Sequence, residues 1–408
     1  MVINCYEFGA ASSHLECGSV VSPRLTLQSG DILSDTMIPL AVPDMRGNEA
    51  AYLVRCVEDN WMSSGGPSVI EFERKMADLT GRLHGIAMAS GTAALHLALT
   101  VAGVRPGDHV IVPDWTFAAT ANAVYHAGAV PLFVDVTRES WTLDPALTGE
   151  AIAKAARTAQ RRIAAVVAVH ALGHPADLDP LAEICRAAGI PLIEDAAGAI
   201  GARYRGRPAG SVGNAAIFSF NGNKTVTAGG GGMIVTDDAV WAERARSLST
   251  QGRISGAYRY DVVGFNYRMP NINAAVGIAQ LERLDEMVAA KRRIASIYDR
   301  ALESRDDLIA MPRCGWADSA CWLYALRCPS PNDAADLAAT LHDRAIDARV
   351  FWESLAHQAP YCGAPRLLSG VSNNLSGHVV TLPCSSSLPP ADQKRVCNAL
   401  AVWAPRRT

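Results

Sequence analysis

Lys224 and Asp195 are the two residues whose types and surroundings favour a specific chemistry. Lys224 lies in FSFNGNKTVTAGGGGMIV (218–235) and Asp195 in PLIEDAAGAIGA (191–202), and both segments begin with short strand-like runs. Chemistry with pyridoxal 5'-phosphate (PLP) needs a lysine that forms an imine with the cofactor aldehyde and a carboxylate that keeps the pyridine nitrogen protonated. The two segments therefore predict a PLP site and amino-group transfer.

The surroundings of Lys224 favour catalysis over the commoner role of a solvated surface lysine. A strand-like run ends at Ser219 shortly before it, and four glycines, Gly229–Gly232, follow it. Glycines allow close backbone approach and unusual φ values beside a bulky ligand. We expect Lys224 to form the imine and, once an incoming amine has freed it, to move a proton between the substrate carbon and the cofactor.

Asp195 ends an apolar run that predicts a buried strand, and ligands of open α/β sheets bind where strands end. A plain helix N-cap is the alternative for an isolated aspartate. Neighbouring side chains on a strand face opposite sides, so Glu194 is expected to point away from the site. His170 and His174 are expected to be structural, because two histidines do not define a zinc site, and we expect no metal.

A phosphate site is predicted at Ser90-Gly91-Thr92-Ala93, where a turn opens a helix. Free backbone N–H groups at a helix N-terminus bind phosphate. A simple serine cap is the alternative. With Ser219 added, we assign Gly91, Thr92 and Ala93 to the cofactor phosphate.

Three further residues are candidates for the cofactor site. Phe117 in VPDWTFAAT could stack on the pyridine ring, with Trp115 as its competitor two residues away. Asn266 and Arg268 in GFNYRM (264–269) lie in an expected turn and are candidates for binding an anion. Helix capping by the asparagine and a solvated arginine are the alternatives, and the sequence leaves both open.

Composition indicates a globular protein with a large core and two or three domains, because 49% of the 408 residues are hydrophobic. Basic and acidic residues balance at 37 against 40, which excludes an electrostatic footprint for nucleic acid or for an anionic membrane. The ten cysteines are dispersed and form no CxxC pair, which is typical of reduced thiols in the cytosol. No signal peptide is evident, so we expect a cytoplasmic location.

The chain order predicts an α/β fold. Val/Ile/Leu runs alternate with helical patterns between about residues 86 and 235, which is typical of a mostly parallel sheet between helices. A 3.6-residue period over 271–304 predicts one long helix that links to a smaller α+β domain. We divide the chain into an N-terminal extension (1–36), a large PLP-binding domain (37–285) and a small C-terminal domain (286–408).

Taken together, these ordered segments resemble the DegT/StrS family of nucleotide-sugar aminotransferases, which are PLP enzymes of fold type I. The resemblance covers about residues 37–400, and many ordered motifs are more specific than any one of them. The motifs include SGTAALHLAL (90–99), VIVPDWTFAATANAV (110–124), EDAAGAIGA (194–202), SFNGNKTVTAGGGGMI (219–234) and GFNYRMPNINAAVGIAQLERLD (264–285).

The resemblance implies that Lys224 forms the internal aldimine, that Asp195 faces the pyridinium and that Phe117 stacks on the ring. It also implies that the GFNYR loop, with Asn266 and Arg268, reaches into the neighbouring subunit's site. The expected assembly is a homodimer with shared active sites.

Within the family, SFNGNK and SWTLDP (140–145) are most similar to enzymes acting on UDP-linked 4-keto-6-deoxy-N-acetylhexosamines, of the legionaminic and bacillosamine type. This implies a ping-pong reaction in which glutamate leaves its amine, 2-oxoglutarate departs and the 4-keto sugar collects the amine. A cyclitol or other keto acceptor is an alternative, as is a non-catalytic PLP-binding scaffold or regulator. Lys224 argues against a sugar 3-dehydratase, which would have histidine at position 224. A nicotinamide dehydrogenase is disfavoured because no GxGxxG follows the first strand.

One departure from the family pattern is Gly198, which follows EDAA where the family usually has a polar side chain. We include Gly198 among the residues beside the cofactor. The missing side chain removes a hydrogen bond near the cofactor's phenolic oxygen and is expected to leave room for water or a shifted substrate.

Overall fold

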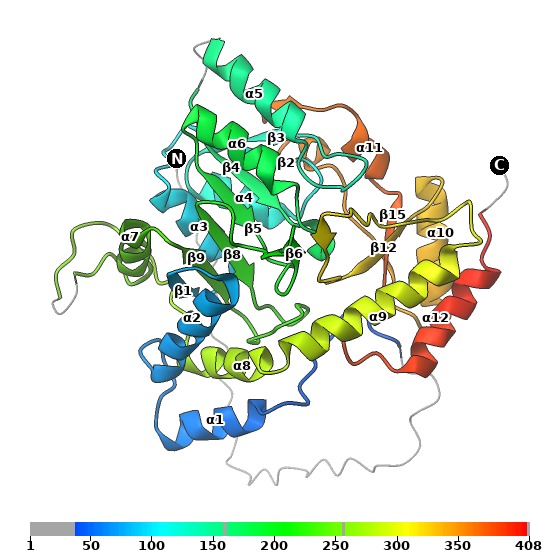
Figure 1. Ribbon diagram of the computed structural model, residues 1–408, viewed down its shortest axis with the longest axis horizontal. Helices are drawn as coiled ribbons and strands as arrows, with labels where there is room; N and C mark the ends of the chain where they lie inside the picture. Colours follow the sequence, from blue (N-terminus) through cyan, green and yellow to red (C-terminus); the bar gives the residue numbers. More distant parts are fainter. Residues whose placement is uncertain (1–36, 158–160, 255–257, 406–408) are drawn as a thin grey trace, which may run out of the picture. The chain divides into compact units, whose positions relative to one another are not determined.

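The computed structural model describes residues 37–157, 161–254 and 258–405. The predicted N-terminal extension, residues 1–36, lies outside the described residues. Two sheets of very different size organise the rest of the chain, and long helices pack around both (Figure 1).

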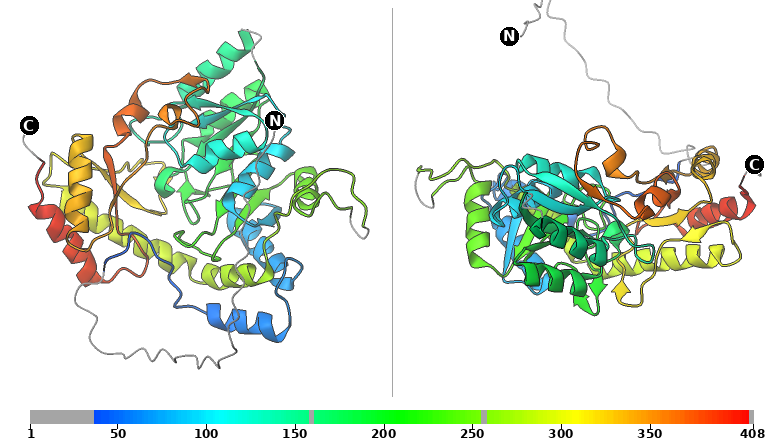
Figure 2. Two further views of the ribbon diagram at one scale, coloured as in Figure 1. Left: turned by 180° about the vertical axis from the view of Figure 1, so that it is seen from behind. Right: turned by 90° about the horizontal axis from the view of Figure 1, so that it is seen from above.

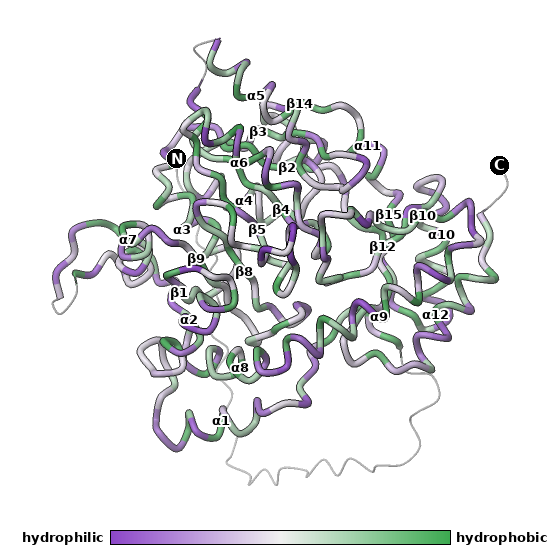
Figure 3. Tube along the Cα trace, in the orientation of Figure 1, coloured by the Kyte–Doolittle hydropathy of each residue, from purple (hydrophilic) through white to green (hydrophobic). Residues whose placement is uncertain are grey.

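The larger sheet has the strand order β1-β9-β8-β5-β4-β2-β3-β14. The pairs from β8 through β14 are parallel, whereas β9 runs antiparallel to β1 and β8. The apolar runs predicted as strands form it, and every residue of β4 is buried, as expected for a strand covered on both faces. Its strands are β1 (His84–Met88), β2 (His109–Pro113), β3 (Val130–Val134), β4 (Ile163–Val169), β5 (Leu192–Asp195), β8 (Ala215–Ser219), β9 (Gly232–Thr236) and β14 (Arg366–Leu367). Figure 3 shows hydrophobic stretches through these strands.

Helices cover both faces of this sheet, and alternate strand residues contribute to the two resulting cores (Figures 1 and 2). One face carries α3 (Gly91–Val101), α4 (Ala118–His126) and α7 (Ala239–Ser249). The other carries α2 (Pro67–Thr80), α5 (Pro145–Arg157), α6 (Leu178–Ala188) and α8 (Asn271–Leu281). The arrangement is the α/β fold that the sequence predicted.

The smaller sheet is antiparallel, with the order β10-β12-β15-β13. Its strands are β10 (Ile309–Ala310), β12 (Tyr324–Arg327), β13 (Arg349–Val350) and β15 (Val379–Leu382). It shares a core with α9 (Leu284–Leu302), α10 (Pro331–His342) and α12 (Pro390–Val402). The remaining elements are short: α1 (Glu49–Glu58), α11 (Val371–Leu375), η1 (Ala171–Gly173), η2 (Leu355–His357), and a small sheet of β6 (Arg203–Tyr204), β7 (Arg207–Pro208) and β11 (Ala317–Asp318).

Two short segments cross the predicted boundary between residues 285 and 286. Strand β14 follows the boundary in sequence yet pairs with β3 of the larger sheet. Ile38 precedes it yet bridges to Ile346 beside the smaller sheet. The division into domains 37–285 and 286–408 stays a prediction.

The single long helix predicted over 271–304 is wrong, because the chain forms two helices, α8 and α9. Arg283 leaves the helical conformation between them, at φ −115° and ψ 11°. Its guanidinium reaches Asp44 at 3.1 Å and Glu286 at 2.8 Å. The hydrogen bond from Arg46 and the contacts of Arg283 hold the pKa of the Asp44 carboxyl well below its usual range, although burial opposes them. This long-range ion pair has no signature in the local periodicity.

Among the described residues, no helix is long and apolar enough to cross a membrane. The same part of the chain contains no group of three or more His, Cys, Asp or Glu side chains arranged to hold a metal ion.

Candidate active site

A cavity of about 540 Å³ lies at the carboxyl ends of the parallel strands β2, β4, β5 and β8. This is where open α/β sheets bind ligands. Segments around the smaller sheet close the cavity with Trp322, Arg349, Phe351 and Trp352. Both Lys224 and Asp195 line it, so the structure brings together the two residues that the sequence predicts for PLP chemistry.

Asp195 is the last residue of β5 and is only 6% exposed. The hydroxyl of Thr120 donates to its Oδ2 at 3.0 Å, and the amide of Ala197 donates to its Oδ1 at 3.2 Å. Burial raises the pKa of Asp195, although the two hydrogen bonds and the charge of Lys224 partly oppose the rise. A cationic group in the cavity would stabilise this carboxylate.

Lys224 follows β8 in the loop before the glycine run, and its side chain faces the cavity. Burial lowers the pKa of Lys224 to about 8, with the nearby Asp195 charge opposing the shift. The neutral amine is the nucleophile in imine formation, so a lowered pKa makes Lys224 more reactive near neutral pH.

The N-terminus of α3 and the end of β8 meet at the same cavity. Gly91, Thr92 and Ser219 all line it, and a Cβ added to Gly91 would lie 2.8 Å from the Cβ of Ser219. Only glycine permits this close approach. Ala93 is not among the lining residues, and its amide donates to the Ser90 hydroxyl at 3.1 Å, as in an ordinary helix cap; its assignment to the phosphate stays a prediction. The N-terminus of α3 therefore presents Gly91 and Thr92 to an anion.

Phe117 and its competitor Trp115 occupy different environments. Phe117 lines the cavity and is 61% exposed. Trp115 is fully buried and packs edge-on against Trp141 and Trp352. Of these two, Phe117 is therefore the one whose ring can face a ligand in the cavity.

The space beside Gly198 is filled, which corrects the expectation of room for water or a shifted substrate. A Cβ at Gly198 would lie 2.7 Å from Cε3 and 3.1 Å from Cδ2 of Trp322. The indole reaches this place from the segment between β11 and β12, more than a hundred residues along the chain. Trp322 therefore occupies the volume that a side chain at position 198 would take.

Glu194 points away from the cavity, as the alternation of strand side chains predicted. It is fully buried on the other side of β5, where His170 Nε2 approaches its Oε2 at 3.0 Å. His170 touches the cavity wall but makes this buried contact with its ring. His174 is also buried, with Nδ1 2.8 Å from the Pro175 carbonyl oxygen.

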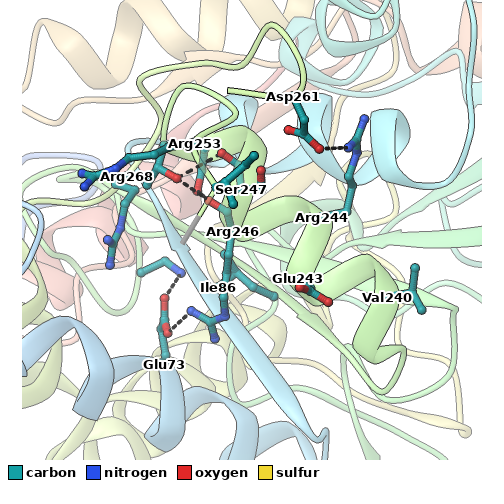
Figure 4. A pocket seen from close by; sticks show the side chains of 14 residues that line it. Glu73, Ile86, Val240, Glu243, Arg244, Arg246, Ser247, Arg253, Asp261 and Arg268 are labelled. Carbon is teal, nitrogen blue, oxygen red and sulfur yellow. Dashed lines mark hydrogen bonds and ion pairs between the residues drawn. The ribbon is translucent and has the colours of Figure 1, made fainter. Parts of the chain in front are cut away.

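Asn266 and Arg268 do not line the Lys224 cavity. Arg268 instead lines a separate cavity of about 880 Å³ between α7, β1 and the segments 250–254 and 258–268 (Figure 4). Glu73 and Arg246 form an ion pair of 2.6 Å in that cavity. Asn266 is exposed and bridges to Thr250. Arg268 also bridges to Met88 at the end of β1, so the segment runs beside the Lys224 cavity although neither residue lines it.

Sequence reasoning missed several residues of the cavity wall, including Thr120, Trp322, Arg349 and Trp352. Thr120 lies three residues after Phe117, in the first turn of α4, and its bond to Asp195 joins residues far apart in the chain. The other three come from distant segments whose approach leaves no local signal in the sequence.

Comparison with known proteins gives the family. The model of the DegT/DnrJ/EryC1/StrS aminotransferase family matches residues 43–401. A relative named GDP-perosamine synthase from Caulobacter vibrioides is 38% identical over 367 residues, covering 89% of this chain and 97% of that protein. The erythromycin biosynthesis sensory transduction protein EryC1 of Saccharopolyspora erythraea is 38% identical over 327 residues, covering 79% and 86%.

A solved structure gives the same result at the level of the fold. DesI, determined in the presence of its TDP-sugar product, superposes with a TM-score of 0.81 at 29% identity, covering 90% of this chain and 93% of that one. This chain belongs to the DegT/DnrJ/EryC1/StrS aminotransferase family. It is a PLP-dependent sugar aminotransferase.

The residues of the cavity fit PLP. A buried carboxylate without a full counter-charge suits a protonated ring nitrogen, and an amine of lowered pKa suits the aldehyde. The free amides at the start of α3 and the Ser219 hydroxyl suit a phosphate, and the exposed ring of Phe117 suits an aromatic face.

Proposed function

We propose that this aminotransferase moves an amino group from glutamate to the 4-keto carbon of a nucleotide-linked 4-keto-6-deoxy sugar. The observation that carries the proposal is the placement of Lys224, Asp195 and the N-terminus of α3 around one cavity. The names of the relatives support a nucleotide-linked sugar as the acceptor.

When bound, PLP supplies an aldehyde that takes up amines and a ring that accepts an electron pair from carbon. Lys224 holds it and, when freed, carries the proton at Nζ. Asp195 keeps a proton on the ring nitrogen, and the Thr120 hydroxyl fixes the orientation of that carboxylate. Phe117 covers the ring.

Other predicted residues bind the cofactor phosphate or act in the partner's site. The amides of Gly91 and Thr92 and the hydroxyl of Ser219 bind the phosphate oxygens, and Asn266 and Arg268 act in the partner's site. The observation that neither residue lines the Lys224 cavity of its own chain supports a homodimer with shared sites. Exposed apolar residues of the same segment, Tyr258 at 84% and Val263 at 93%, are suited to burial against a second copy.

The short sequence motifs and the name of a relative point to different nucleotide bases. The SFNGNK and SWTLDP segments favoured a UDP-linked N-acetylhexosamine, whereas a relative covering nearly the whole chain is named for a GDP-linked sugar. Because that relative matches along 89% of the chain and the two segments are short, we favour a GDP-linked acceptor.

A screen of acceptors tests the proposal. The holoenzyme is given glutamate with GDP-, UDP- and TDP-linked 4-keto-6-deoxy sugars and with an inosose, and products are followed by mass spectrometry and 2-oxoglutarate release. We expect amination of the GDP-linked sugar. Amination of the inosose alone would instead establish a cyclitol aminotransferase.

The name of EryC1 as a sensory transduction protein favours one second candidate, a PLP-binding regulator. Release of 2-oxoglutarate from glutamate separates the two, because only the enzyme carries out this half-reaction. Borohydride should fix the cofactor to Lys224 in both cases. Failure of borohydride to label Lys224 would contradict both.

A further inference from the structure

Trp322 is held in place by hydrogen bonds to two separate parts of the chain and follows a residue in a strained backbone conformation. Its indole Nε1–H donates to the carbonyl oxygen of Asn223 at 2.8 Å, so the ring is tied to the residue just before Lys224. Its own carbonyl accepts from the buried ammonium of Lys291 at 3.1 Å. Cys321 before it has φ +50°, a left-handed conformation that is costly for a side chain of this kind.

Glycine at position 198 is what admits the indole. Any side chain there would meet the six-membered ring of Trp322 at 2.7 Å, closer than real Cβ contacts. The family's usual polar residue and this tryptophan therefore exclude each other. Gly198, in the loop after β5, thus leaves the space that the indole of Trp322 fills from the distant 319–323 segment.

The face of that ring lies against the reactive amine. Lys224 Nζ is 3.4 Å from the centroid of the Trp322 ring, well inside the range of a cation–π contact. The other charged or titratable side chains that line the same cavity are Asp195, His170 and Arg349. Of these, Asp195 alone is a carboxylate, so the indole face is the second electron-rich group offered to the ammonium.

We propose that the indole face of Trp322 holds the Lys224 ammonium whenever that lysine is not bonded to the cofactor, and that Gly198 is glycine in order to admit the indole. Trp322 is then a positioning residue. It keeps the freed amine near the reacting carbon and stabilises its charged form. This inference rests on the proposed role of Lys224 but not on the identity of the acceptor.

Fluorinated tryptophan tests the contact without changing its shape. Fluorine withdraws electrons from the ring face, so the ammonium loses stabilisation and the pKa of Lys224 should fall below its value in the unlabelled protein. The cofactor-free protein is labelled by trace acetic anhydride across a range of pH, and the peptide with Lys224 is quantified against that with Lys394, which is exposed on α12. We expect a downward shift of about half a pKa unit or more with trifluorotryptophan.

All eight tryptophans are replaced in that protein, so Trp322→Phe is the matched control. Fluorotryptophan should no longer shift the pKa of Lys224 in this variant. An equal shift in the control, or none in the parent protein, would overturn the proposal.

Gly198→Ala supplies a second, independent measurement. The added methyl must displace the indole from the Lys224 ammonium. The pKa of Lys224 in the cofactor-free protein should therefore fall. Gly222→Ala should not, because nothing lies within 4 Å of a Cβ there. Equal titrations for the two variants would refute the pairing of Gly198 with Trp322. If these tests fail while borohydride fixes the cofactor to Lys224 and the sugar is aminated, the proposed function stands and only this inference is lost.

Discussion

Glu194→Gln is a near-isosteric change that should destabilise the protein because of where its hydrogen-bond donors lie. Glu194 Oε1 accepts from the amides of Val212 and Gly213, both at 2.7 Å. Oε2 accepts from the amide of Gly210 at 2.8 Å and approaches His170 Nε2 at 3.0 Å. All four partners are donors, so an ionised carboxylate satisfies them and an amide cannot.

The histidine cannot adapt to the change without leaving another donor unsatisfied. The amide of Ala176 donates to His170 Nδ1 at 3.0 Å, so the ring proton sits on Nε2 and faces Glu194. In Glu194→Gln, the new NH₂ must oppose two donors, from either Gly210 and His170 or Val212 and Gly213. Two buried donors without an acceptor cost about 2–6 kcal/mol. For a chain of 408 residues this lowers Tm by about 2–7 °C.

Thermal unfolding followed by circular dichroism measures the effect. Glu183→Gln is the control, because Glu183 is exposed on α6. Burial raises the pKa of Glu194, but the hydrogen bonds from His170 and from the amides of Gly213 and Gly210 outweigh it and lower the pKa overall. The ionised carboxylate therefore stabilises the fold above its ordinary pKa, and this contribution is lost as pH falls through the lowered folded value.

The Tm difference between the parent protein and Glu194→Gln should accordingly stay constant from pH 7 down to the ordinary pKa of glutamate, about 4.3, and narrow as the pH falls further. A Tm for Glu194→Gln within 1 °C of the control at neutral pH would refute this account of the buried carboxylate.

Two further predictions concern the reaction and the assembly. Asp195→Asn should retain the fold, because its amide oxygen can accept from the Ala197 amide while the Thr120 hydroxyl turns to accept from the new NH₂. The change removes the charge opposite the ring nitrogen, and a shift of about 1–3 units in the pKa of that nitrogen corresponds to about a 10- to 1,000-fold loss in kcat/KM. A near-normal rate would show that the ring is held differently. Lys224→Ala and Arg268→Ala should each be inactive as homodimers. Mixing the two variants after dissociation should restore about one quarter of the parent activity, because half of the re-formed dimers are mixed and each mixed dimer has one intact site out of two. If native mass spectrometry confirms mixed dimers but no activity returns, Arg268 acts in its own chain's site.

The sheet was predictable because its signal is local. Strands buried on both faces need continuous runs of Val, Ile and Ala, as in β4, and the helices between them carry a 3.6-residue period. The positions of Lys224 and Asp195 follow from the same reasoning, because residues at the carboxyl ends of neighbouring parallel strands meet at one edge of the sheet. The break between α8 and α9 escaped prediction because the 3.6-residue period continues through it. The structure places there the ion pair of Arg283 with Asp44, a residue far away in the chain.

By itself, the sequence determined the fold class, the pair of Lys224 and Asp195 at the strand ends, and the family motifs that connect them to PLP. The tertiary structure alone decided what surrounds that pair. It showed that the amide of Ala93 donates to the Ser90 hydroxyl in a helix cap, that Arg268 lines another cavity, and that Trp322 fills the space beside Gly198. The physical reason is range: strand and helix patterns arise from neighbours in the chain, whereas a cavity wall is assembled from segments that meet only when the two cores pack.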